Sequence, residues 1–253
     1  MRRLLHLTDT HIDADTAARF DGIDTRASFV ASLAAARAED AHGLLLGGDL
    51  SMDGSAASYR WLAHRLAALD VPWWAVPGNH DEPLAWPGPH GGGFGVLPRV
   101  VPLPPWRLIL LSTRVDGEAG GALGTAQLAW LETTLAAARA GHDLIVMHHP
   151  PLAVDSAWID AMGLADADAF WRCLEPPHRV RAVLCGHVHQ VFDRRRGPLR
   201  VLTTPSTCAQ FLPRARRYAT DVRGPAYRVL DLADDGAIAT RVERLPRAEF
   251  LSA

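Results

Sequence analysis

The sequence predicts an α/β fold, and three observations support this prediction. Short apolar runs alternate with longer amphipathic segments along most of the 253 residues. Polar motifs rich in Asp, His and Gly directly follow several of the apolar runs. The last quarter of the chain contains short β-rich runs separated by turn residues. Such a pattern is typical of a parallel sheet that binds a ligand at the carboxyl ends of its strands.

The first part of the chain predicts the order strand, helix, strand, helix, strand. The expected strands are 4–7, 43–46 and 73–76, and the expected helices are 25–38 and 56–69. Consecutive βαβ units bring their strands together in parallel through right-handed crossovers. We therefore expect these three strands to share one parallel sheet.

The same alternation continues beyond a Pro- and Gly-rich stretch at 83–98. The expected strands are 107–112, 143–147 and 180–185, and the expected helices are 167–174 and 125–139, the latter capped by Thr125. The stretch at 83–98 predicts a surface loop near the binding site rather than a domain boundary. We expect residues 1–253 to form a single domain.

The last quarter of the chain changes character. Short β-rich runs occur at 191–194, 199–203, 226–232 and 238–244, with turn signals such as Asp234-Asp235-Gly236 between them. Consecutive short strands joined by tight turns usually pair antiparallel. We expect a second, mostly antiparallel sheet that packs on the first.

The composition indicates neither a nucleic-acid partner nor a membrane protein. The net charge is −2, and no segment approaches the roughly 18 apolar residues that are needed to cross a bilayer. Three cysteines, Cys173, Cys185 and Cys208, are an odd number without CxxC spacing. This usage favours a reducing compartment, so we expect a cytoplasmic protein.

Five polar motifs contain the residues from which chemistry is expected. They are Asp9-Thr10-His11, Gly48-Asp49, Gly78-Asn79-His80-Asp81, His148-His149-Pro150 and Gly186-His187-Val188-His189. Four of the five begin where an apolar run stops, so the carboxyl edge of the sheet would gather them. Each motif alone is weak, because short combinations of Asp and His occur by chance.

The residue types in these motifs predict two metal ions. Imidazole, carboxylate and amide groups without cysteine suit Mn, Fe or Zn, whereas Ca and Mg prefer shells made entirely of oxygen. Side chains two positions apart on an extended segment point the same way. Asp9 and His11, and likewise His187 and His189, are therefore expected to be able to share an ion.

The ordered set of motifs resembles the calcineurin-like metallophosphoesterase superfamily, from Asp9 to His189 and with no ligand position missing. The resemblance implies a four-layer α/β/β/α sandwich of two mixed sheets flanked by helices. The stretches 155–160, 205–211 and 224–227 further resemble the class III bacterial 3′,5′-cyclic nucleotide phosphodiesterases. Members of that group form dimers, which leaves a homodimer open here.

The resemblance also implies a role for each residue of the motifs. Asp9, His11 and His189 would hold one metal ion, Asn79, His148 and His187 would hold the other, and Asp49 would bridge both. A hydroxide that also bridges the ions would attack phosphorus, and His80 would donate the proton to the leaving oxygen. Asp81 either orients that imidazole or is a turn residue.

The implied activity is hydrolysis of a small phosphodiester, with cyclic AMP as the expected substrate. The alternatives are a glycerophosphodiesterase, a broad-specificity phosphodiesterase or phosphomonoesterase, and a non-enzymatic protein that kept the metal ligands. Three residues have open roles: His149 and His90 beside the site, and Trp158, whose ring is a candidate for stacking on a base. The arginines at 194–196 are interpreted as solvated turn residues, with a phosphate or dimer contact as the alternative.

Overall fold

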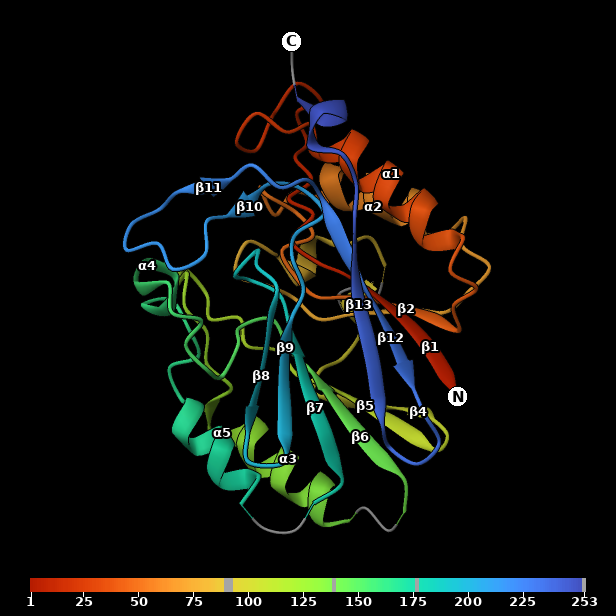
Figure 1. Cartoon of the computed structure of the whole chain (residues 1–253), viewed down its shortest axis with the longest axis vertical. Helices are drawn as coiled ribbons and strands as arrows, with labels where there is room; N and C mark the ends of the chain where they lie inside the picture. The colour runs from red at the N-terminus through yellow and green to blue at the C-terminus, as the bar shows by residue number, and fades with distance from the viewer. Residues whose placement is uncertain (89–92, 138–139, 176–177, 252–253) are drawn as a thin grey trace.

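The computed structural model describes residues 1–88, 93–137, 140–175 and 178–251, which form two β-sheets with helices on their outer faces (Figure 1). The first sheet has the strand order β13 (Ile238–Arg244), β12 (Ala226–Leu232), β1 (Arg2–Leu7), β2 (Gly43–Leu46) and β3 (Trp73–Ala75). The second has the order β4 (Arg99–Leu103), β5 (Trp106–Leu110), β6 (His142–Val146), β7 (Val180–Cys185), β9 (Leu199–Thr203) and β8 (Phe192–Arg196).

Both sheets are mixed: the first is antiparallel at one edge only, and the second is parallel in the middle and antiparallel at both edges. In the first sheet β1, β2 and β3 are parallel, as the βαβ pattern predicts, whereas β12 and β13 pair antiparallel. In the second sheet β5, β6, β7 and β9 are parallel, and β4 and β8 are antiparallel edge strands. The α/β/β/α class is thus confirmed.

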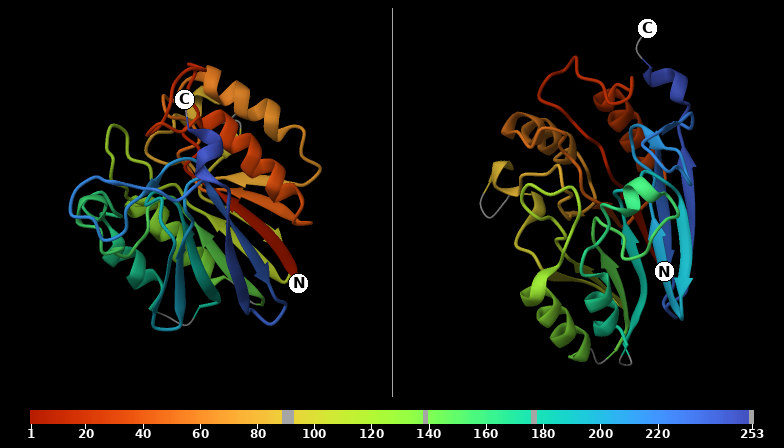
Figure 2. Two further views of the ribbon diagram at one scale, coloured as in Figure 1. Left: turned by 45° about the horizontal axis from the view of Figure 1, so that its top comes forward. Right: turned by 90° about the vertical axis from the view of Figure 1, so that its left-hand side faces the viewer.

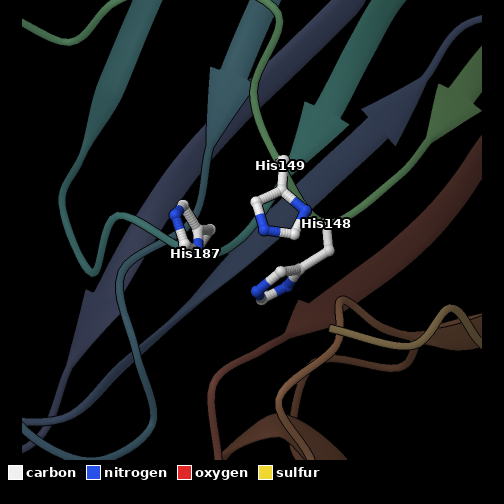
Figure 3. A group of neighbouring side chains, drawn as sticks. All are labelled: His148, His149 and His187. Atoms are coloured by element: carbon white, nitrogen blue, oxygen red, sulfur yellow. The ribbon is translucent and has the colours of Figure 1, made fainter. Parts of the chain in front are cut away.

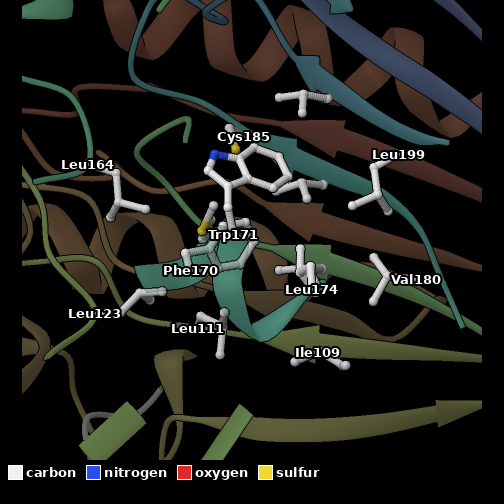
Figure 4. Close-up of a cluster of buried hydrophobic side chains, with 14 of the residues drawn as sticks. Ile109, Leu111, Leu123, Leu164, Phe170, Trp171, Leu174, Val180, Cys185 and Leu199 are labelled. Carbon is white, nitrogen blue, oxygen red and sulfur yellow. The ribbon is translucent and has the colours of Figure 1, made fainter. Parts of the chain in front are cut away.

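Each sheet is covered by one pair of helices. Helices α1 (Thr25–Arg37) and α2 (Ala56–Leu66) lie on the first sheet, and α3 (Gly124–Ala136) and α5 (Ala167–Cys173) lie on the second (Figure 2). Three buried clusters separate these layers. Figure 4 shows the cluster between the second sheet and its helices, in which Phe170 and Trp171 pack with Ile109.

The alternation of side chains along the strands produces the middle layer. On β1, Leu4 joins the cluster between the two sheets, while Leu5 joins the cluster beneath α1 and α2. Leu108 and Leu184 meet Leu4 from the second sheet. Because both faces of the central strands are buried, strands such as β2 and β7 are almost continuously apolar, whereas the edge strand β8 is charged and exposed.

The prediction of a separate antiparallel sheet in the last quarter is wrong. Strands β8 and β9 extend the second sheet, and β12 and β13 extend the first. Local pairing was anticipated correctly, since β8 with β9 and β12 with β13 are antiparallel neighbours. Each hairpin joins the sheet whose apolar face it covers. The turn residues specify the hairpin and do not specify that sheet.

Several local predictions also need correction. Strand β4 was not anticipated, and Arg194 to Arg196 belong to edge strand β8 instead of a turn. Helix α3 begins at Gly124, and its first N–H groups are capped by the distant Asp166, whose carboxylate accepts from Leu123 N and Gly124 N at 3.0 and 2.8 Å. Thr125 is therefore not the cap.

The Pro- and Gly-rich stretch packs on the first sheet's outer layer. It contains a short 3-10 helix (Pro83–Ala85), and the rings of Trp86 and Phe94 are buried against Tyr59. None of its described residues lines the site pocket. His90 lies outside the described residues.

The remaining segments surround the carboxyl edge of both sheets. The loop after β6 contains a single helical turn, α4 (Ala157–Asp160), and β10 (Gln210–Phe211) and β11 (Thr220–Asp221) form a hairpin beside it (Figure 1). A 3-10 helix (Arg247–Phe250) follows β13. Within the described ranges, no helix combines the length and apolar character that crossing a lipid bilayer requires.

Candidate metal centre

The five polar motifs converge at the seam between the two sheets. Asp9, Asp49 and Asn79 follow β1, β2 and β3 of the first sheet. His148 follows β6, and His187 and His189 follow β7, in the second sheet. Their side chains meet because the carboxyl ends of both sets of parallel strands face the same edge.

One group of donor atoms contains Asp9, His11 and His189. Asp9 Oδ1 lies 3.3 Å from His189 Nε2, and the two histidines approach through their Nε2 atoms at 3.2 Å. All three side chains are buried. A carboxylate oxygen and two imidazole nitrogens this close together form a ready set of ligands for a divalent ion.

A second group surrounds His148. Its Nε2 lies 3.4 Å from Asp49 Oδ2, and its ring is 5.2 Å from the ring of His187. The Nε2 atoms of both histidines and Oδ1 of Asn79 are buried and have no hydrogen-bond partner among the described residues. Because buried polar atoms are normally paired, these three atoms at one place fit the ligands of a bound cation.

Asp49 contacts both groups through a single oxygen atom. Its Oδ2 lies 3.4 Å from Nε2 of His148 and 3.8 Å from Nε2 of His11. The other oxygen, Oδ1, accepts a hydrogen bond of 2.9 Å from the backbone N–H of His80. The carboxylate is thereby oriented with one oxygen toward both groups, as a bridging ligand requires.

The backbone of the ligand motifs adopts conformations that most residues avoid. Asp9, His11, Asp49, His187 and His189 all have left-handed backbones, with φ between 45° and 70°. Such conformations in non-glycine residues carry strain that surrounding structure must offset, and they cluster at functional sites. The prediction that Asp9 and His11 lie on an extended segment is therefore wrong, because β1 ends at Leu7.

Backbone carbonyl groups set the tautomers of two histidines. Nδ1–H of His148 donates to the carbonyl of Gly47 at 2.7 Å, and Nδ1–H of His189 donates to that of Ala209 at 2.8 Å. In both rings, Nε2 is then the nitrogen with a free lone pair. Carbonyl partners of this kind orient metal-binding imidazoles in other proteins.

The charges of the buried histidines also fit a cation site. Burial lowers the pKa of His11 to about 3, so this imidazole is neutral. At His148 burial acts in the same direction, but the carboxylates of Asp49 and Asp9 overcome it and raise the pKa to about 9. A proton on His148 thus supplies the positive charge that the two carboxylates require when no metal ion is bound.

His149 has both ring nitrogens engaged in hydrogen bonds, although one of them lies within 4.8 Å of ligand atoms of His148 and His187. Figure 3 shows the imidazoles of His148, His149 and His187 gathered at the ends of their strands. His149 Nδ1 bonds the hydroxyl of Thr113 at 2.7 Å, and Nε2–H donates to the carbonyl of Ala119 at 3.1 Å. With both nitrogens occupied, His149 packs beside His187, with a ring distance of 4.3 Å.

Asp81 connects two of the ligand loops and does not orient His80. Its buried carboxylate accepts from the N–H groups of Leu50, Ser51 and Gly78 and from the hydroxyl of Tyr59. The interpretation of Asp81 as a residue that supports the chain turn is therefore the one that the contacts favour. Gly78 is required in this loop because a Cβ atom there would lie 2.2 Å from Asp49 Oδ1.

His80 lines the pocket, and of its two ring nitrogens only Nδ1 has a hydrogen-bond partner among the described residues. Its Nδ1 is 3.3 Å from the carbonyl of Met52, and its ring packs edge-on against His11 at 5.0 Å. One of its nitrogens lies within 4.8 Å of the donor atoms of both His11 and Asp49. If Nδ1–H donates to Met52, then Nε2 is the atom that can exchange a proton with a ligand in the pocket.

A pocket of about 300 Å³ opens over the donor groups. Its lining includes polar residues described above, such as His80 and Asn79. It also includes the rings of Phe20, Trp158, Phe211 and Tyr218 together with the side chains of Ile159 and Met162. Of these rings, only Trp158 was singled out from the sequence. Phe211 ends the stretch 205–211, which carried part of the resemblance, whereas Phe20 and Tyr218 belong to no motif, and the folded loops bring all of these rings to the pocket.

The model of the calcineurin-like phosphoesterase family matches residues 2–191, a range that contains every donor described here. The chain belongs to the calcineurin-like phosphoesterase family. Family membership fits the clustered His and Asp donors, and the family's divalent metal ions are compatible with ligands of these types.

Full-length relatives of this phosphoesterase carry phosphodiesterase names. It is 39% identical over 252 residues to the 3′,5′-cyclic adenosine monophosphate phosphodiesterase CpdA of Vibrio vulnificus, covering 98% of this chain and 92% of the relative. It is 36% identical to the CpdA of Escherichia coli strain K12, covering 98% and 91%. It is 35% identical to a 3′,5′-cyclic-nucleotide phosphodiesterase of Nostoc, covering 96% and 92%.

Solved structures share the fold at much lower identity. A dimetal phosphatase from Danio rerio superposes with a TM-score of 0.69 at 15% identity, covering 90% of this chain and 94% of that one. GAP50, described as the anchor in the inner membrane complex of Plasmodium, superposes with a TM-score of 0.58 at 12% identity, covering 96% and 84%. The fold therefore supports different roles, and function must be argued from the site.

Proposed function

We propose that this phosphoesterase is a metal-dependent phosphodiesterase that hydrolyses 3′,5′-cyclic nucleotides, with cyclic AMP as its main substrate. The observation that carries the proposal is the position of Asp49 Oδ2 between two donor groups, 3.8 Å from His11 and 3.4 Å from His148. The names of the relatives, which match nearly the whole chain, support the choice of substrate.

The donor groups define which residues would hold the two ions. Asp9, His11 and His189 would hold one, Asn79, His148 and His187 the other, and Asp49 both. Mn, Fe and Zn suit this mixture of nitrogen and oxygen ligands. Bound at these positions, such ions supply Lewis-acid activation of water and of the phosphoryl oxygens.

His80 supplies the proton that the leaving group requires. In the hydrolysis, the elements of water are added, the P–O3′ bond breaks, and the released 3′-oxygen must be protonated to leave as a hydroxyl. His80 holds that proton on Nε2 while Nδ1 faces the carbonyl of Met52. Asn79 lines the pocket beside it, where its amide can orient a phosphoryl oxygen.

The proposal also covers the domain organisation, the localisation and the oligomeric state of the protein. Residues 1–253 would act as one catalytic domain, because both sheets contribute ligands to each donor group. The three cysteines are unpaired, which is in keeping with a cytoplasmic enzyme. A homodimer remains a prediction, which light scattering on the purified protein would test.

A substrate panel with the Mn-loaded protein tests the proposed function. We expect kcat/KM for 3′,5′-cyclic AMP to exceed the values for 2′,3′-cyclic AMP, a glycerophosphodiester and a simple monoester. If kcat/KM is highest for the glycerophosphodiester, or similar for all four substrates, the phosphoesterase chemistry stands, but cyclic AMP is not the main substrate. A metal-loaded protein that is inert even toward bis-p-nitrophenyl phosphate would instead indicate a non-enzymatic protein.

A further inference from the structure

Four aromatic rings that line the pocket beside the metal ligands, Phe20, Trp158, Phe211 and Tyr218, are here called the aromatic wall. Trp158 lies 5.0 Å from Phe211 and 5.1 Å from Tyr218, measured between ring centroids. Three segments far apart in the sequence supply these rings. Their convergence on one small pocket means that the wall is a product of the tertiary fold.

The aromatic wall is in direct contact with one of the donor groups. Phe211 stacks on the imidazole of His189 with ring centroids 3.9 Å apart and planes within 6°. Phe20 stacks on His11 at 4.7 Å. A ligand that reaches the donor groups with one end therefore meets aromatic carbon with the other.

Trp158 carries a buried polar atom that the protein leaves unpaired. Its indole Nε1 has no hydrogen-bond partner within the described part of the chain. By contrast, the indole N–H groups of Trp106 and Trp171 donate to the carbonyls of Ala233 and Pro151 at 2.8 and 2.9 Å. Buried indole N–H groups normally find an acceptor, so the unpaired N–H distinguishes Trp158 from Trp106 and Trp171.

The loop around Trp158 is fixed before any ligand binds. The carboxylate of Asp160 accepts from the N–H groups of Val154 and Ser156 at 2.7 and 3.0 Å. The hydroxyl of Ser156 in turn accepts from Gln190 Nε2 and from Arg214 N. A side chain that is already ordered loses little conformational entropy when it binds a ligand, which favours a recognition role.

These observations define the chemistry of the ligand. A ligand whose phosphoryl end lies at the metal ligands would meet the aromatic wall in the same pocket, and a flat ring is the group that packs best against it. Glycerol and other small alcohols have no flat apolar face, whereas a nucleobase has both a face and ring-nitrogen acceptors.

We propose that the aromatic wall binds the nucleobase of the substrate and that Trp158 determines the preference for nucleotides over base-free phosphodiesters. This inference rests on the proposed function for the identity of the reacting phosphodiester. It goes beyond that function because it assigns a base-binding subsite, which the metal chemistry does not require.

The test compares two substrates that contain the same reacting atoms. They are 3′,5′-cyclic AMP and methyl ribofuranoside 3′,5′-cyclic phosphate, which lacks the base. Trp158→Ala should lower kcat/KM for cyclic AMP by about 5- to 100-fold, the range of base stacking on one aromatic side chain. It should leave kcat/KM for the base-free compound within about twofold. Trp158→Phe keeps a ring and loses the N–H. Its kcat/KM for cyclic AMP should lie between the wild-type value and that of Trp158→Ala.

Trp130→Ala is the matched control. Trp130 is a partly buried tryptophan that packs on the same apolar cluster as Trp158 and does not line the pocket. Trp130→Ala should change kcat/KM for both substrates by the same factor. A melting temperature for each variant separates loss of folding from loss of recognition.

A binding measurement makes the inference independent of turnover. Wild-type protein should bind 5′-AMP more tightly than ribose 5-phosphate by calorimetry, and Trp158→Ala should abolish that difference. Equal binding of the two ligands by the wild-type protein, or an unchanged preference in Trp158→Ala, would overturn the base-binding subsite. If the wild-type protein hydrolyses neither cyclic compound, the proposed function fails, and the binding difference still decides the role of the aromatic wall.

Discussion

Asp49 illustrates how backbone and side chain act together at the scale of single residues. Its φ of 48° is left-handed, and the N–H of His80 holds one carboxylate oxygen. The remaining oxygen faces His11 and His148 at once. Burial would raise the pKa of this carboxyl, but the neighbouring imidazoles, above all His148, hold it well below its usual range. The carboxylate is therefore ionised and ready to bind metal.

Replacing this carboxylate should remove both activity and metal. In Asp49→Ala, we expect kcat/KM to fall by more than about 100-fold, because even residues one contact away from a metal contribute about 10- to 100-fold. Elemental analysis should show less bound metal per chain. Asp193→Asn is a control, since Asp193 pairs with Arg200 in the second sheet and belongs to neither donor group. Normal metal content together with full activity in Asp49→Ala would refute the bridging role.

The role of His80 predicts a dependence on the leaving group. His80→Ala should keep its metal, because the donor groups do not require this ring. For a substrate with an alkoxide leaving group, kcat should fall by about 10²- to 10⁴-fold, the usual contribution of general acid catalysis. For bis-p-nitrophenyl phosphate the loss should be much smaller, since p-nitrophenolate leaves without a proton. Equal losses on both substrates would contradict proton donation.

At the scale of elements, the start of helix α3 shows how a distant residue replaces a local cap. Thr125 fits the preference for hydroxyl residues at helix starts, yet the helix begins before it. The carboxylate of Asp166, at the start of α5, accepts from the backbone of Leu123 and Gly124. It thus satisfies two N–H groups and also fixes α3 to α5.

The capping interaction predicts a stability difference between two single variants. Asp166→Ala should lower the free energy of unfolding by about 1 kcal/mol, the usual value of a lost helix cap. For a chain of this size, that corresponds to a fall of about 3 °C in Tm. Thr125→Ala should leave Tm unchanged within the error of calorimetry. A larger fall in Thr125→Ala than in Asp166→Ala would show that the local residue is the cap after all.

At the scale of the whole molecule, the site depends on the packing of the two sheets. The first sheet supplies Asp9 and His11 to one donor group, and the second sheet supplies His189. The other group likewise combines residues from both sheets. The middle apolar layer that joins the sheets, with Leu4, Leu108 and Leu184 among its members, therefore also determines the geometry of the donors.

This arrangement predicts that metal stabilises the fold. Both sheets contribute to each donor group, so ions that bind the folded state would link them. At a free ion concentration of about 1,000 times Kd, binding raises the free energy of unfolding by about 4 kcal/mol. For a chain of this size, that corresponds to a rise in Tm of roughly 10 °C. Scanning calorimetry of protein treated with EDTA, before and after Mn²⁺ is restored, measures this shift. An equal response to Mn²⁺ in Asp49→Ala would place the stabilising ion elsewhere.

The sequence by itself determined the alternation of strands and helices and the chemistry of the donor residues. Both are local properties: periodicity fixes an element, and residue type fixes what it can coordinate. The positions of β1, β2 and β3 follow from this, as does the gathering of Asp9, Asp49 and Asn79 at the carboxyl edge of the first sheet.

Only the tertiary structure decided features that depend on contacts between distant segments. These include the sheet that β12 and β13 join, the cap that Asp166 provides, and the left-handed backbone at Asp9. His149 and His148 are neighbours of one residue type, and only the bonds of His149 to Thr113 and Ala119 separate their roles. The aromatic wall belongs to the same class, because only packing brings together its rings from three separate segments.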